Sequence, residues 1–355
     1  VTALPFAYLR YQNKAFKFSA IRIISVVITI SFNLLFLIAI PFYFGDDYTS
    51  LPIYRSTNLV TFVFIANFIG SFSTLLMLAK EFKRFRINID IKLFKKLLNY
   101  GIPILIISIS FMITEVADKI LLKYLLPNKL EADSQLGIYS ACYKLAIIMM
   151  LFIQMFRYAA EPFFFAEAKK KDAKKTYSQV MTLFIAFTWF IFLLVTLNIN
   201  LFKYFIGEDF WPGLKIVPII LSAKLFLGVF YNLSLWYKLT NKTLYGAIIA
   251  IIGGLITIIL NVLLIPKFGF IGSAWANFIS YFAIMTISYF WGRRVYRINY
   301  ELNRILLYSI LAMSIYFIGY YLLVFQPIIN YSLTALLLVF YALFVINKEK
   351  QLKYN

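Results

Sequence analysis

Ten long apolar stretches, separated by short polar connections, constrain this chain more than any other feature of its sequence. A helix of about 20 residues crosses the hydrocarbon core of a bilayer, and the stretches are close to that length or longer. A helix also satisfies its own backbone hydrogen bonds, as lipid surroundings require. The sequence therefore predicts an all-α, polytopic transmembrane helix bundle. The expected spans are 21–44, 57–79, 98–125, 136–165, 177–202, 213–236, 243–265, 269–292, 304–324 and 328–346.

The composition argues against a soluble protein and against several kinds of catalyst. Hydrophobic residues make up 62% of the chain and charged residues 14%, whereas soluble domains carry about 25% charged residues. One cysteine, Cys142, and no histidine exclude an intrachain disulfide and histidine-based general base catalysis. The sequence also contains no Walker loop. We therefore expect no cofactor, no metal site and no enzymatic activity.

The basic residues predict the orientation of the chain in the membrane. Of 35 Lys and Arg residues, 25 lie in alternate connections on one side, 4 lie on the other side and 6 lie within the spans. An excess of Lys and Arg marks cytoplasmic loops. Both ends of this segment are therefore expected in the cytoplasm, with the spans in the inner (plasma) membrane. The net charge of +20 does not indicate a nucleic-acid partner, because the Lys and Arg residues form short clusters that alternate with long apolar runs.

Ionisable residues within the third span, 98–125, are candidates for a buried site. A charge at the centre of a membrane helix costs about 2.5–3.5 kcal/mol on insertion scales, so such residues are expected to face a partner or a cavity. Glu115, Asp118 and Lys119 fall on one helical face. Glu115 and Lys119 are four residues apart and could simply pair with each other. The alternative is that this face lines a transport cavity.

A second polar stripe follows one face of the fourth span, 136–165. Tyr139, Tyr143, Gln154, Arg157 and Glu161 project within about 60° of one another on a single helix. Arg157 and Glu161 could again pair with each other, or Arg157 could line a cavity.

The spans carry more basic than acidic residues, which favours an anionic substrate such as a pyrophosphate. Lys224, in the sixth span, is the best cavity candidate there. The candidate substrate-binding residues are Arg157, Lys119, Lys224, Glu161, Asp118, Glu115, Tyr143 and Gln154.

Several short motifs occur in an order and spacing similar to those of a known transporter family. They are Tyr100-Gly101-Ile102-Pro103, Asp118-Lys119-Ile120-Leu121-Leu122, Gly137-Ile138-Tyr139-Ser140-Ala141 with Tyr143-Lys144-Leu145-Ala146, Phe156-Arg157-Tyr158-Ala159-Ala160-Glu161-Pro162-Phe163, and Leu260-Asn261-Val262-Leu263-Leu264-Ile265-Pro266 with Gly269-Phe270-Ile271-Gly272-Ser273-Ala274. Together they resemble the Wzx-type polysaccharide flippases. The superfamily to which these flippases belong also contains the MATE drug exporters and the lipid II flippase.

The resemblance implies a fold, a domain organisation and a function. If Tyr100 begins helix seven of a fourteen-helix protein, the ten spans correspond to helices 5–14, and helices 1–4 are absent from this segment. Residues 1–97 would end the first lobe with a basic linker at about 80–97, residues 98–292 would form the second six-helix lobe, and residues 293–355 would supply two extra helices and a basic tail. The implied function is to flip a lipid-pyrophosphate-linked oligosaccharide between leaflets by alternating access. Implied partners are that lipid, membrane lipids and other polysaccharide assembly proteins, with H⁺ or Na⁺ left open as the coupling ion.

Other functions remain as alternatives to a flippase. A cation-coupled multidrug exporter of the same superfamily would be favoured by an acidic interior. A membrane glycosyltransferase or polysaccharide polymerase would need carboxylates in sizeable outer loops. The outer acidic pairs Asp46-Asp47 and Glu208-Asp209 lie in short connections. A scaffold without transport activity is the last alternative.

Overall fold

A computed structural model gives the fold of residues 2–12, 14–45, 54, 59–82, 90–322 and 327–354. Within these residues, nine helices are long and apolar enough to cross a membrane. The chain divides into two compact units, Val1–Ile91 and Lys92–Asn355. The predicted acidic pair Asp46-Asp47 and the linker residues 83–89 lie outside the described residues.

The first unit is built around two long helices. Residues Phe16–Phe44 form one continuous apolar helix that includes a π-helical turn at Leu35–Ala39. Its first part, α2 (Ala15–Leu34), packs against α5 (Leu59–Met77). The Ser25 hydroxyl donates to the Gly70 carbonyl at 3.0 Å, which shows how small side chains let the two helices approach. The other described helices of this unit are α1 (Ala3–Tyr11), α3 (Ile40–Phe44) and α6 (Ala79–Phe82).

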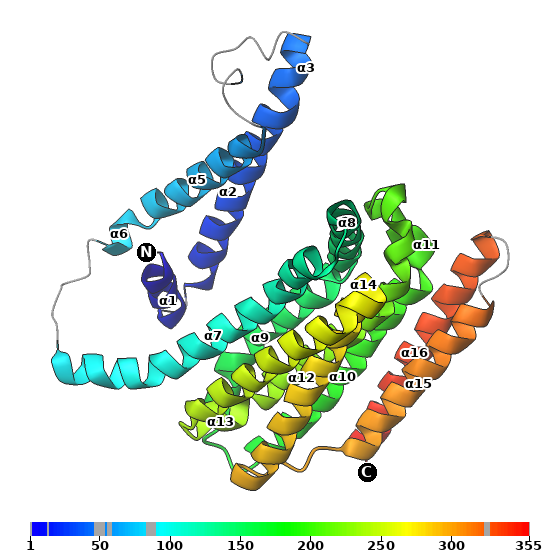
Figure 1. The fold of residues 1–355 in the computed structure, drawn as a ribbon. Helices are drawn as coiled ribbons and strands as arrows, with labels where there is room; N and C mark the ends of the chain where they lie inside the picture. The colour runs from blue at the N-terminus through cyan, green and yellow to red at the C-terminus, as the bar shows by residue number, and fades with distance from the viewer. Residues whose placement is uncertain are drawn as a thin grey trace. The chain divides into compact units, whose positions relative to one another are not determined.

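The second unit is a bundle of helices joined by short connections (Figure 1). Helix α12 packs against α14 and α10, while α15 and α16 lie side by side and both contact α10. The Asn128 side chain accepts from the Leu130 and Glu131 N–H groups and so caps the start of α8. The helices are α7 (Ile91–Leu125), α8 (Lys129–Leu145), α9 (Ile147–Glu167), α10 (Ala173–Leu197), α11 (Ile199–Phe202), α12 (Val217–Leu233), α13 (Leu235–Leu239), α14 (Thr243–Val295), α15 (Leu302–Leu322) and α16 (Pro327–Tyr354).

Helix α14 is a hairpin of two membrane helices rather than one straight rod. Its backbone leaves the helical region at Gly269, where φ is 55° and ψ is −136°. The Ser273 hydroxyl donates to Oδ1 of Asn261 at 2.9 Å, and Gly253 lies against Ile284 further down the two arms. The arms therefore run antiparallel. The two predicted spans at 243–265 and 269–292 are confirmed, with the turn at Pro266–Gly269 where the sequence placed it.

The fourth predicted span, 136–165, is interrupted in the structure. Helix α8 ends at Leu145 and α9 begins at Ile147, with Ala146 between them. The predicted polar stripe therefore does not lie on one uninterrupted helix. Its tyrosines belong to α8, and Gln154, Arg157 and Glu161 belong to α9.

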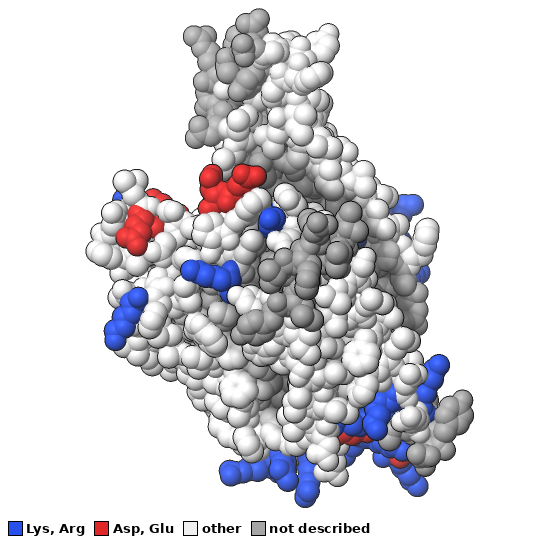
Figure 2. Space-filling model, turned by 90° about the vertical axis from the view of Figure 1, so that its right-hand side faces the viewer, with Lys and Arg blue, Asp and Glu red and all other residues white. Residues whose placement is uncertain are grey.

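Basic side chains gather at the end of the second unit where α14 ends and α15 begins (Figure 2). The connection between these two helices contains Arg297, and the last turn of α14 contains Arg293 and Arg294. Together with the apolar helices, this distribution describes a multi-pass membrane protein.

Candidate functional site

The centre of the second unit contains an ion pair between two distant helices. Lys224 of α12 is buried, with a side chain that is 1% exposed, and its Nζ lies 2.5 Å from Oε1 of Glu115 on α7. Glu115 also accepts hydrogen bonds from the Tyr143 hydroxyl at 2.5 Å and the Tyr281 hydroxyl at 2.7 Å. One carboxylate thus contacts α8, α12 and α14 at once. Such dense pairing is what allows charges to remain within an apolar bundle.

Asp118 extends this arrangement one helical turn along α7. It is fully buried and accepts from the Tyr139 hydroxyl at 2.6 Å and from Nδ2 of Asn277 at 2.8 Å. The Asn277 amide is also 2.8 Å from the Tyr139 hydroxyl, so the three side chains close a triangle. We use the term Glu115 network for Glu115, Asp118, Tyr139, Tyr143, Lys224, Asn277 and Tyr281.

Aromatic rings supply additional contacts for the cations of this region. The Lys224 ammonium lies 4.6 Å from the centre of the Tyr143 ring, and the Lys119 ammonium lies 4.4 Å from the same centre. The negative face of an aromatic ring attracts a cation at such distances, and the attraction grows when water is excluded. Tyr143 therefore lies between two lysines that come from α7 and α12.

The sequence allowed ion pairs between residues of the same helix, but the structure pairs these carboxylates with lysines of other helices. Glu115 pairs with Lys224 rather than with Lys119, and Glu161 pairs with Lys238 of α13 at 2.6 Å rather than with Arg157. In both cases the partner comes from a neighbouring helix. These ion pairs hold helices together.

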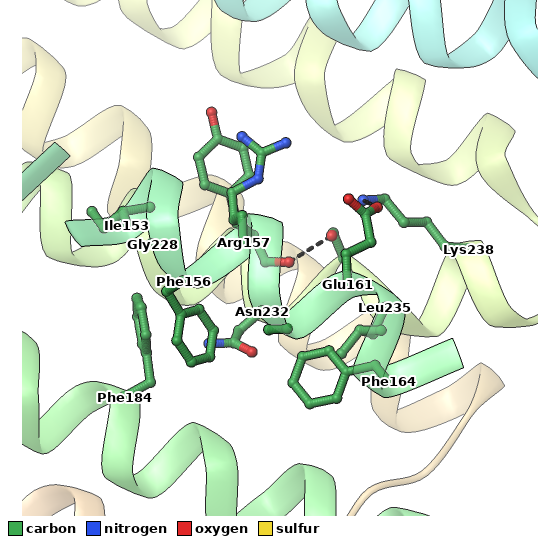
Figure 3. A pocket seen from close by; sticks show the side chains of 13 residues that line it. Ile153, Phe156, Arg157, Glu161, Phe164, Phe184, Gly228, Asn232, Leu235 and Lys238 are labelled. Atoms are coloured by element: carbon green, nitrogen blue, oxygen red, sulfur yellow. Dashed lines mark hydrogen bonds and ion pairs between the residues drawn. The ribbon is translucent and has the colours of Figure 1, made fainter. Parts of the chain in front are cut away.

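A second polar site, the Arg157 pocket, lies among α9, α10, α12 and α13 (Figure 3). In Figure 3, Arg157, Glu161 and Lys238 lie on one side of the pocket, and Phe156, Phe164 and Asn232 lie on the other. We use this name for the cavity lined by Ile153, Phe156, Arg157, Ala160, Glu161, Phe164, Phe184, Gly228, Tyr231, Asn232, Ser234, Leu235 and Lys238.

Two side chains in this pocket have unused binding capacity. The Arg157 guanidinium lies 4.0 Å from the Tyr231 ring centre, and within the described ranges no carboxylate lies within 4.0 Å of it. Asn232 is 6% exposed, and its Nδ2 finds no hydrogen-bond acceptor among the residues that the structure describes. A guanidinium and a buried amide donor that line the same pocket can bind an anionic oxygen.

Helix α12 contributes to both sites. It supplies Lys224 to the Glu115 network and Tyr231 to the Arg157 pocket, two helical turns further along. The remaining core of this unit is mostly aliphatic and aromatic.

The predicted site residues divide into three groups. Glu115, Asp118, Tyr143 and Lys224 belong to the Glu115 network, and Lys119 lies beside it. Arg157 and Glu161 line the Arg157 pocket. Gln154 is exposed and bonds to Tyr158 at 3.3 Å, outside both groups.

Sequence reasoning missed several members of these sites. Asn277 and Tyr281 lie four residues apart in the span 269–292, on the same helical face as Ser273, and this spacing was a usable signal. Lys238 follows the predicted span 213–236 and was not among the predicted site residues, but its ion pair with Glu161 brings it into the lining of the Arg157 pocket. Tyr231 and Asn232 carry no charge, and no spacing pattern in the sequence marks them as site residues.

Comparison with solved structures gives a match to the lipid II flippase MurJ in an inward closed conformation. The TM-score is 0.54 at 19% sequence identity, and the match covers 90% of this chain and 67% of that chain. Family models and curated proteins give no match. The likeness confirms the predicted all-α polytopic fold.

Proposed function

We propose that this chain acts as a flippase that moves a lipid-pyrophosphate-linked oligosaccharide from the cytoplasmic to the outer leaflet. The observation that carries the proposal is Arg157, a cation in the candidate membrane span Ile147–Glu167 that shares its pocket with a buried amide and has no carboxylate within 4.0 Å among the described residues. Keeping such a charge in the bilayer costs free energy, and binding of an anionic headgroup would offset that cost.

The state of the carboxylates supports an anionic rather than a cationic substrate. Glu115 is paired with Lys224, Glu161 is paired with Lys238, and Asp118 accepts from Tyr139 and Asn277. A cationic drug would have to displace one of these partners. A pyrophosphate would meet an arginine whose donors face no acidic partner in the described part of the chain.

The fold supports alternating access as the mechanism. The structural neighbour is a flippase in an inward closed conformation. In the proposed cycle, the charged headgroup crosses through a hydrated cavity against residues 98–292, the second lobe, while the lipid tail remains in the bilayer. Residues 1–97 would end the first lobe, residues 293–355 would add two helices, and the protein would act in the inner membrane beside other polysaccharide assembly proteins.

The test is a charge comparison at Arg157 in the complete protein, expressed in cells whose surface polysaccharide depends on it. Arg157→Ala is expected to abolish surface glycan and to accumulate the lipid-linked precursor on the cytoplasmic side at unchanged protein level. Arg157→Lys, which keeps the charge but loses the bidentate geometry, is expected to retain part of the activity. Lys144→Ala removes an exposed lysine within the membrane and is the matched control.

Normal surface glycan in the Arg157→Ala strain, together with a change in drug tolerance, would show an exporter instead of a flippase. Loss of glycan in the Lys144→Ala strain to the same extent would show that any lost basic residue has this effect.

A further inference from the structure

A second hollow of the bundle lies away from the polar sites and is almost wholly apolar. It lies between α10, α12, the second arm of α14 and α15, and its volume is about 400 Å³. Ligand pockets in proteins have volumes of about 300–1,000 Å³. Its walls include Trp189, Leu225, Val229, Met285, Tyr289 and Leu306. It shares no lining residue with the Arg157 pocket, so an occupant here is separate from the proposed transport path.

One face of α14 continues from this apolar groove to a basic group. Met285, Tyr289 and Arg293 follow one another at intervals of four residues, so they lie on the same helical face about 6 Å apart along the axis. Arg293 lines a smaller hollow that shares Tyr289, Tyr300 and Leu233 with the groove. The basic group and the apolar groove are therefore adjacent.

The charge at this end of the groove is not neutralised by the protein. Arg293, Arg294 and Arg297 are exposed, and in the described part of the chain none has a carboxylate within 4.0 Å. The Arg297 Nε bonds to Oδ1 of Asn299 at 3.3 Å, an uncharged partner. Three arginines within five residues form a positive surface at the end of a candidate membrane helix, and such surfaces attract the anionic phosphates of a bilayer.

We propose that this groove binds an anionic phospholipid of the surrounding bilayer. One acyl chain lies in the apolar groove, and the phosphate is bound by Arg293. The occupant is a bilayer lipid because the groove belongs to a multi-pass membrane protein, its walls offer few polar partners, and the unneutralised charge is positive. An arginine fork binds a phosphate through two parallel N–H···O bonds, which a lysine cannot reproduce.

The experiment uses the purified complete protein in detergent and counts bound lipid by native mass spectrometry. The three probes are dioleoyl phosphatidylglycerol, dioleoyl phosphatidylcholine, which has the same chains and no net charge, and glycerol phosphate, which has no chain. Only the first is expected to remain bound through purification. Arg293→Gln is expected to weaken its binding about fivefold, the equivalent of about 1 kcal/mol for one basic residue at an anionic surface.

Two further variants separate the headgroup from the chain. Thr286→Phe places a ring in the groove and is expected to weaken phosphatidylglycerol binding without changing any charge. Among the described residues, the Thr286 hydroxyl donates only to the Phe282 carbonyl of its own helix, so its loss breaks no contact between helices. Lys171→Gln removes an exposed charge from a different connection and is expected to leave binding unchanged. Equal binding of the two phospholipids, or native affinity in the Arg293→Gln protein, would overturn the proposal. Retention of glycerol phosphate would show a simple anion site.

Discussion

The Lys224 ammonium on α12 lies 2.5 Å from the Glu115 carboxylate on α7, although 109 positions separate the two residues in the chain. The lysine side chain is 1% exposed. Removing one partner of a buried pair leaves the other charge without compensation, which destabilises by about 3–5 kcal/mol in soluble proteins.

Lys224→Met is accordingly expected to lower the thermal midpoint of the purified protein strongly, and Glu115→Gln in the same background is expected to restore part of the loss. The thermal midpoints of the two single variants and the double variant form a double-mutant cycle. Lys215→Met, at an exposed lysine near the start of α12, is the control. Additive effects of the two substitutions would mean that the pair contributes no coupling energy.

Two adjacent glycines of the α14 hairpin should respond oppositely to alanine. A Cβ on Gly253 would lie 2.6 Å from Cγ2 of Ile284 on the other arm, whereas a Cβ on Gly254 would meet only Thr114 Oγ1 at 3.7 Å. Gly253→Ala is expected to destabilise by about 1–3 kcal/mol, because the packed arms must separate. Gly254→Ala is expected to be neutral or stabilising by about 0.5–1 kcal/mol, since alanine is the better helix former. Chemical or thermal unfolding of the two variants would measure both changes in stability. Equal changes would contradict close packing at Gly253.

The turn of the hairpin depends on a glycine backbone. Gly269 has φ of 55° and ψ of −136°, a region that side-chain-bearing residues rarely occupy, and the Gln135 side chain lies directly over it. Gly269→Ala is expected to cost about 1–3 kcal/mol of stability. Gly101→Ala, where open space surrounds the Cα, provides the comparison. An unchanged thermal midpoint in the Gly269→Ala protein would show that the turn can adopt another geometry.

Ion pairs and a hydrogen bond join the first turns of α15 to the last turns of α16. Arg304 of α15 forms ion pairs with Glu301 and with Glu349 of α16, and the Tyr308 hydroxyl donates to Glu349 at 2.6 Å. Glu349→Gln is expected to accelerate hydrogen exchange in the last turns of α16 while leaving α12 unchanged. Lys350→Gln alters the neighbouring exposed position and is expected to have no such effect. Identical exchange in both variants would show that apolar contacts alone hold α16 in place.

Features that a single segment determines by itself were predictable from the sequence. The apolar runs defined the membrane helices, and Pro266 and Gly269 defined the hairpin turn, because both signals act within a few residues. The break at Ala146 gave no such signal: Ala146 carries no turn-forming side chain, so the span 136–165 was read as one helix.

The pairing of charges could not be predicted in this way. A helical wheel places Glu115 and Lys119 on one face, but it contains no information on what the neighbouring helix presents. Lys224 reaches Glu115 only because α12 packs beside α14, whose Tyr281 binds the same carboxylate. That eight residues bind substrate remains a prediction, although the structure brings seven of them into or beside the two polar sites of the second unit.

The closed triangle of Asp118, Tyr139 and Asn277 has a mechanical consequence. Three side chains from α7, α8 and α14 bond to one another, and Glu115 adds α12 one turn away, so these helices cannot slide independently without breaking several buried bonds together. The four helices should therefore move as one rigid body during a transport cycle. Any change in backbone conformation should then occur in segments outside this group.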